Sequence, residues 1–139
     1  MKLKYDTNLL QYMNFFKKVT GMNSRDCFIS GNSLIFVAEE NKAGLAVGKN
    51  GKNIQILKRS LKKNVKIIEY ATTPEKLAVN FVFPLKPTKV EIEDNVLAIH
   101  FARGSERRYL LSDNKAKLNQ LKDVMKIYYS DIAEITVPQ

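Results

Sequence analysis

The sequence predicts an α+β protein of two small domains, each with the element order helix, strand, strand, helix, helix, strand. Two observations predict this class. The same order of structural signals occurs twice along the 139 residues, at an offset of about 64 residues. In each copy, apolar residues at helical spacing alternate with short apolar runs typical of strands. We therefore expect domains over residues 1–72 and 73–139, each with a three-stranded sheet packed on its helices.

The first copy opens with a helix followed by a hairpin. Thr7 and Asn8 can cap the helix, an apolar face follows at helical spacing, and Gly21 can end it. Two short apolar runs then flank Gly31 and Asn32, a pair able to take the positive φ angles of a two-residue hairpin turn. The hairpin supplies the first two strands of the unit.

Two helices and a strand complete the first copy. A short helix is expected near residues 42–47, and a glycine-containing loop follows it. The next helix places Ile54, Leu57 and Leu61 on one face, because they are spaced at i, i+3 and i+7. The segment from residue 65 to residue 70 is typical of a closing strand.

The second copy repeats these signals. Thr73 can cap a helix that has Pro74 at its first position, and prolines at 84 and 87 end that helix. Asp94 and Asn95 form another hairpin pair. A later helix repeats the apolar spacing of Ile54, Leu57 and Leu61 at Leu118, Leu121 and Met125, and residues 132–137 are typical of the last strand.

Positive charge is concentrated in the first half of the chain. Residues 1–72 carry 13 Lys and Arg against 5 Asp and Glu, whereas residues 73–139 carry 10 against 9. No acidic residue occurs over residues 41–68, which hold Lys42, Lys49, Lys52, Lys58, Arg59, Lys62, Lys63 and Lys66. Such a field suits a polyanionic partner. A lysine-rich solvated surface would show the same run.

The loop at residues 48–51 has the residue types that binding of a nucleic-acid backbone requires. Gly48 and Gly51 bracket two polar residues between helices, and glycine lets a nucleic-acid backbone approach the main chain closely. The next helix begins near Lys52, so its positive dipole end would lie beside phosphates to which Lys49 and Lys52 add charge. Neighbouring apolar residues would form a floor for bases.

In this context the sequence resembles a KH domain of the second topological type. The tandem pair, over roughly residues 5–138, resembles the archaeal NusA transcription factors. The resemblance implies a nucleotide-clamping loop, single-stranded RNA as ligand, action on nascent RNA in transcription elongation or termination, and RNA polymerase as protein partner. The candidate RNA-binding residues are Gly48, Lys49, Asn50, Gly51, Lys52, Lys42, Asn53, Lys58 and Arg59.

The second copy departs from the motif at its loop. The repeat offset places the two glycines of the motif at positions 112 and 115, but the residues there are Ser112 and Lys115. Asp113 would repel a phosphate where Lys49 attracts one. Because this loop is degenerate, we expect the second unit to buttress the first or to contact a protein, and not to clamp RNA itself. Three nearby arginines, Arg103, Arg107 and Arg108, could extend a phosphate track ahead of the second loop, and a solvated basic cluster balanced by Glu106 would show the same residues.

Two alternatives fit the same sequence. A KH-fold adaptor that contacts RNA polymerase or a ribonucleoprotein through protein surfaces, with only nonspecific RNA affinity, would show the same sequence features. A groove of this kind could also accept single-stranded DNA in place of RNA.

Other classes of function find little support. Gly44 to Asn50 resembles a phosphate-binding NTPase loop only superficially, because one residue is missing between the glycines and no Ser or Thr follows the lysine. One histidine, His100, and one cysteine, Cys27, cannot assemble a His/Cys zinc site or a disulfide. The Glu91 and Glu93 pair is typical of a solvent-facing strand edge. We expect no enzyme activity, metal, cofactor, small-molecule substrate or membrane association, and a cytoplasmic location.

Overall fold

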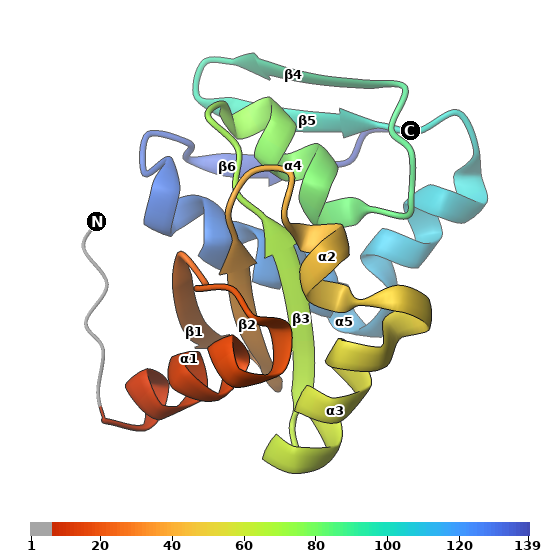
Figure 1. Cartoon of the computed structure of the whole chain (residues 1–139). Helices are drawn as coiled ribbons and strands as arrows, with labels where there is room; N and C mark the ends of the chain where they lie inside the picture. Colours follow the sequence, from red (N-terminus) through yellow and green to blue (C-terminus); the bar gives the residue numbers. More distant parts are fainter. Residues whose placement is uncertain (1–6) are drawn as a thin grey trace. The chain divides into compact units, whose positions relative to one another are not determined.

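The computed structural model describes residues 7–139, and these form two compact units, residues 7–71 and residues 72–139 (Figure 1). Both units combine helices with a three-stranded sheet. Residues 1–6, which belong to the expected first domain, lie outside the described part of the chain.

The first unit follows the expected order of elements. They are α1 (Thr7–Thr20), β1 (Asp26–Ser30), β2 (Ser33–Ala38), α2 (Ala43–Val47), the single 3-10 turn η1 (Lys49–Gly51), α3 (Lys52–Leu61) and β3 (Asn64–Glu69). The helix α1 ends as predicted, because Gly21 has φ 78° and its N–H donates to the Lys17 carbonyl at 2.8 Å. The expected cap is wrong, since Thr7 and Asn8 both lie inside the helix.

The sheet of the first unit is mixed, with strand order β1-β2-β3. The strands β1 and β2 are antiparallel with Ser30 opposite Ser33, which leaves the expected two-residue turn between them. The strands β2 and β3 are parallel, with Leu34 opposite Val65. A parallel pair needs a long crossover, and here α2, η1 and α3 provide it. The candidate loop therefore lies inside the crossover, between two helices.

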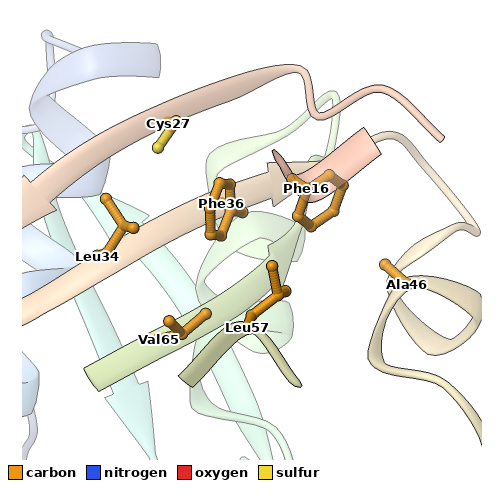
Figure 2. Packing of buried hydrophobic residues seen from close by; sticks show 7 residues of the cluster. All are labelled: Phe16, Cys27, Leu34, Phe36, Ala46, Leu57 and Val65. Atoms are coloured by element: carbon orange, nitrogen blue, oxygen red, sulfur yellow. The ribbon is translucent and has the colours of Figure 1, made fainter. Parts of the chain in front are cut away.

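Side chains from three helices and all three strands form the core of the first unit (Figure 2). The rings of Phe16 in α1 and Phe36 in β2 stack with centroids 4.7 Å apart and planes inclined by 28°. Leu57 lies in this core fully buried, with Ile54 and Leu61 packed around it. The predicted apolar face of α3 thus fixes this helix, and with it the loop that precedes it.

The second unit contains α4 (Pro74–Val82), β4 (Lys89–Glu93), β5 (Val96–His100), α5 (Gly104–Tyr128) and β6 (Glu134–Thr136). The cap prediction is confirmed, because Thr73 Oγ1 accepts a hydrogen bond from the Lys76 N–H at 3.2 Å and Pro74 is the first helical residue. The hairpin prediction is confirmed as well. Asp94 and Asn95 both have positive φ angles, 51° and 63°, as a type I′ turn requires.

The helix α5 is interrupted where the repeat places the second loop. Residues 112–115 have non-helical backbone angles, so α5 consists of two helical segments joined by a short loop. The strands β5 and β6 pair in parallel across this crossover, and β4 pairs antiparallel with β5. The second sheet therefore has the same mixed topology as the first. The α+β class with two such sheets, consistent with tandem KH domains, is confirmed.

Two kinds of feature are absent from residues 7–139. No helix in this range is both long enough and apolar enough to cross a membrane. No group of three or more His, Cys, Asp or Glu side chains in the same range could hold a metal ion.

Candidate nucleic-acid interface

Gly48 occupies a backbone position that only glycine fits. Its angles, φ 84° and ψ 163°, lie in a region essentially reserved for residues without a Cβ. A Cβ placed on Gly48 would lie 2.9 Å from Asn53 Cγ and 3.0 Å from the Asn53 backbone nitrogen. Asn53, a candidate RNA-binding residue, thus lies directly against Gly48 across the loop. The loop is closed tightly at its first glycine.

The rest of the loop turns through left-handed backbone. Asn50 has φ 57° and ψ 27°, and Gly51 has φ 71° and ψ 21°. The Gly51 N–H donates to the Gly48 carbonyl at 3.0 Å and closes the turn. The helix α3 begins at the next residue, Lys52, and no side chain caps its N-terminus. A helix start of this kind favours an anion through its dipole.

Three of the four side chains that could meet phosphates are exposed, and the two lysines have no carboxylate partner among the residues described. Lys49, Asn50 and Lys52 are exposed, and Asn53 is half-buried. Among the residues described, no carboxylate pairs with Lys49 or Lys52. Positive charge at the loop is therefore available to a ligand.

The remaining candidate residues lie at the far ends of the two flanking helices. Lys42 precedes α2 as its N-cap. Lys58 and Arg59 lie in the last turn of α3. A helix rises about 1.5 Å per residue, so Lys58 is about 9 Å along the axis from Lys52. The structure gathers Gly48 to Asn53 at one place and does not bring these three basic residues to it.

One exposed apolar residue beside the loop was missed by the sequence reasoning. Leu45 in α2 is 63% exposed, three residues before Gly48. The equivalent position in the second unit, three residues before Ser112, is Tyr109, which is 54% exposed. The repeat offset could have identified this pair, because it places a large apolar residue at the same position in both copies. An exposed apolar side chain here suits contact with a base.

The second loop keeps the backbone geometry of the first at two of its four positions without any glycine, because Asp113 has φ 54° whereas Lys49 has no positive φ angle. Asn114, with φ 55° and ψ 36°, matches Asn50, and Lys115, with φ 64° and ψ 30°, matches Gly51. Ser112 has φ −69° in place of the +84° of Gly48. The sequence predicts a degenerate loop, and the structure adds that the left-handed residues of its turn persist at Asn114 and Lys115.

A family model described as the KH domain matches residues 11–98, which is more than half of the chain and includes the loop. The chain belongs to the KH domain family. KH domains are nucleic-acid-binding folds in which a loop of the form Gly-x-x-Gly clamps the strand. In this KH protein the matching residues are Gly48 to Gly51.

Curated relatives extend the match over most of this KH protein. A probable transcription termination protein NusA of Methanocaldococcus jannaschii is 24% identical over 128 residues, which cover 90% of this chain and 70% of the relative. A protein of the same description from Methanococcus vannielii is 24% identical over 89% of this chain and 73% of its own. The resemblance to archaeal NusA proteins stated from the motifs is therefore confirmed.

A solved structure supports the fold. The crystal structure of APE1850 matches with a TM-score of 0.78 at 21% sequence identity, covering 96% of this chain and 100% of that one. At this identity the match supports the fold alone.

Proposed function

We propose that this KH protein binds single-stranded RNA through the loop Gly48 to Gly51. The observation that carries the proposal is the backbone of this loop. Gly48 has no Cβ and packs against Asn53, and the turn that follows delivers the chain directly into the uncapped start of α3. A strand can therefore bring a phosphate close to the main chain at the positive end of a helix.

Charge around the loop supports the same ligand. Lys49 and Lys52 flank the turn with exposed ammonium groups that have no carboxylate partner among the described residues. Leu45, exposed beside the loop, supplies an apolar surface for a base. Phosphate contacts position a strand, whereas base contacts add preference for particular sequences. The proposed interface holds both kinds of contact within one turn.

We assign the clamp to the first of the two domains expected from the sequence, residues 1–72, and not to the second, residues 73–139. Asp113 stands in the second loop where Lys49 stands in the first, so a phosphate there would meet a negative charge. Ser112 also lacks the φ angle of Gly48.

The relatives extend the proposal to a biological role. Curated archaeal relatives are described as probable transcription termination proteins NusA. By that relationship this KH protein acts on nascent RNA during transcription elongation or termination, with RNA polymerase as its protein partner. It acts by binding and not by catalysis.

Fluorescence anisotropy tests the proposal. A labelled single-stranded RNA and a duplex of the same sequence are titrated with the protein at several salt concentrations. The proposal predicts tighter binding of the single strand at every salt concentration, because only an unpaired strand can lay its bases beside the loop. Equal affinities for single strand and duplex that both decrease with added salt would instead indicate nonspecific charge attraction. That result would favour an adaptor that works through protein contacts.

A further inference from the structure

A second place with the chemistry of an anion site is a cavity at the start of α5. The cavity has a volume of about 300 Å³. Arg103, Arg107 and Arg108 line it, together with Gly104 and residues 138–139. It belongs entirely to the second unit and involves neither loop. We call it the arginine cavity.

The three arginines of this cavity have no carboxylate partner among residues 7–139. The one acidic residue within the same helical turn is Glu106, whose Oε2 accepts a hydrogen bond from the Lys86 backbone N–H at 3.3 Å. Among the side chains, three positive charges thus stand against one negative charge, the Glu106 carboxylate, which already has a hydrogen-bond donor. The cavity carries an excess of positive charge.

The structure also positions two of the guanidinium groups. Arg107 Nε donates to the Val137 carbonyl at 2.8 Å, which holds the side chain and leaves its terminal nitrogens for other acceptors. Arg108 folds back over the first turn of its helix, so that its Nη1 would lie 3.0 Å from a Cβ placed on Gly104. Gly104 has no positive φ angle that would require glycine. Its missing side chain instead makes room for the Arg108 guanidinium.

We propose that the arginine cavity is a phosphate site through which the second unit contacts RNA without using its own loop. The planar guanidinium group donates two parallel hydrogen bonds to the oxygens of a phosphate, which suits arginine to this ligand better than lysine. No side chain caps α5 at Arg103, so the helix start adds favourable potential. This inference rests on the proposed function, because it takes RNA as the source of the phosphate.

Nuclear magnetic resonance on the ¹⁵N-labelled full chain tests the site directly. The observed signals are the amides of Gly104 and Ser105 and the Nε–H of Arg107. A single-stranded RNA of about twelve nucleotides is expected to shift all three signals. Inorganic phosphate at the same total phosphate concentration is expected to leave them unchanged. Equal shifts with inorganic phosphate would overturn the proposal, because the cavity would then be a site for the free ion.

Matched variants separate the cavity from general charge. The change Arg103→Gln with Arg108→Gln is expected to lower RNA affinity about tenfold. The slope of log affinity against log salt concentration should also decrease by the equivalent of about one phosphate contact. The control Lys76→Gln with Lys126→Gln removes two exposed charges from the same unit, and it should change affinity less than about twofold. Equal losses in both pairs would overturn the proposal.

A third variant blocks the cavity. In Gly104→Asp, a carboxylate in the first turn of α5 suits the helix dipole and lies beside Arg108. We expect this variant to keep its thermal midpoint and to lose RNA affinity as the double arginine variant does. Retained affinity would count against the site.

The two proposals can fail separately. If RNA binds through the first loop while the cavity signals stay fixed, this inference fails and the proposed function stands. If single strands are not preferred over duplex, the proposed function fails, and cavity signals that still shift with RNA would support the phosphate site alone.

Discussion

Asn53 fills the space beside Gly48 that any other residue at position 48 would need. A Cβ on Gly48 would lie 2.9 Å from Asn53 Cγ and 3.0 Å from its backbone nitrogen. The side chain of Asn53 could rotate away, but its backbone belongs to α3 and cannot move without displacing that helix. The first glycine of the loop is thus fixed by sterics as well as by its φ angle.

We therefore expect Gly48→Ala to lower the free energy of unfolding by at least about 2 kcal/mol, because it combines a strained backbone region with a steric clash. The control is Gly51→Asn, which should cost less than about 1 kcal/mol. Asn tolerates left-handed angles, and a Cβ at Gly51 meets Ile54 Cγ2 at an ordinary 3.7 Å. Urea denaturation followed by circular dichroism measures both. Equal costs would contradict the steric explanation.

Leu45 offers a test of the apolar surface beside the loop. Because Leu45 is 63% exposed, Leu45→Ala should change the free energy of unfolding by less than about 0.5 kcal/mol. RNA affinity should nevertheless fall about fivefold, which corresponds to about 1 kcal/mol of lost apolar contact. Anisotropy titration measures the RNA affinity, and thermal unfolding of the same samples measures the stability. Unchanged affinity would remove Leu45 from the interface.

The second loop contains left-handed residues that bear side chains, and this predicts a stabilising substitution. Lys115 has φ 64°, and a residue with a Cβ pays about 1 kcal/mol there. Lys115→Gly should therefore raise the free energy of unfolding by up to about 1 kcal/mol. Asn119→Gly, within the following helical segment, should instead lower it by a few tenths of a kcal/mol. Thermal denaturation compares the two, and a loss of stability in both would contradict the assigned backbone.

Cys27 predicts a pH dependence of stability. Burial in the core raises the pKa of its thiol from 9.0 to about 12, and the charge of Asp26 adds to the effect. The unfolded chain ionises this thiol near pH 9, whereas the folded chain keeps it protonated. Its contribution is thus fully present below pH 9 and is lost as the pH rises toward 12. Cys27→Ala should flatten the fall in stability over that interval. If the free energy of unfolding falls equally with pH in the unchanged protein and in Cys27→Ala, the prediction is contradicted.

Most of the fold follows from local signals in the sequence. Ile54, Leu57 and Leu61 predicted the buried face of α3, and Thr73 with Pro74 predicted the start of α4. The failure at Thr7 and Asn8 has a local cause, because Thr and Asn can lie in the first turn of a helix as well as at its cap.

The candidate site was less accessible from sequence. The glycine spacing located the loop, but the contact between Gly48 and Asn53 depends on the backbone angles of the turn that joins α2 to α3. Lys58 and Arg59 were included for their charge, and helix length places them away from the turn. Loop geometry and helix length, and not residue type, determine these positions.

The assignment of Gly48 to Gly51 as the RNA clamp is tested most directly by changing two identical dipeptides of the first unit. Lys49→Asp with Asn50→Asp places negative charge on the loop, and Asp tolerates the left-handed angles of Asn50. Lys63→Asp with Asn64→Asp makes the same change at exposed positions beyond the far end of α3, about 15 Å along the helix.

Single-stranded RNA affinity is measured for both variants by anisotropy at matched salt, after circular dichroism has shown that both are folded. The loop variant is expected to lose at least about tenfold in affinity and the control less than about threefold. Equal losses, or no loss in the loop variant, would contradict the assignment of Gly48 to Gly51 as the RNA clamp.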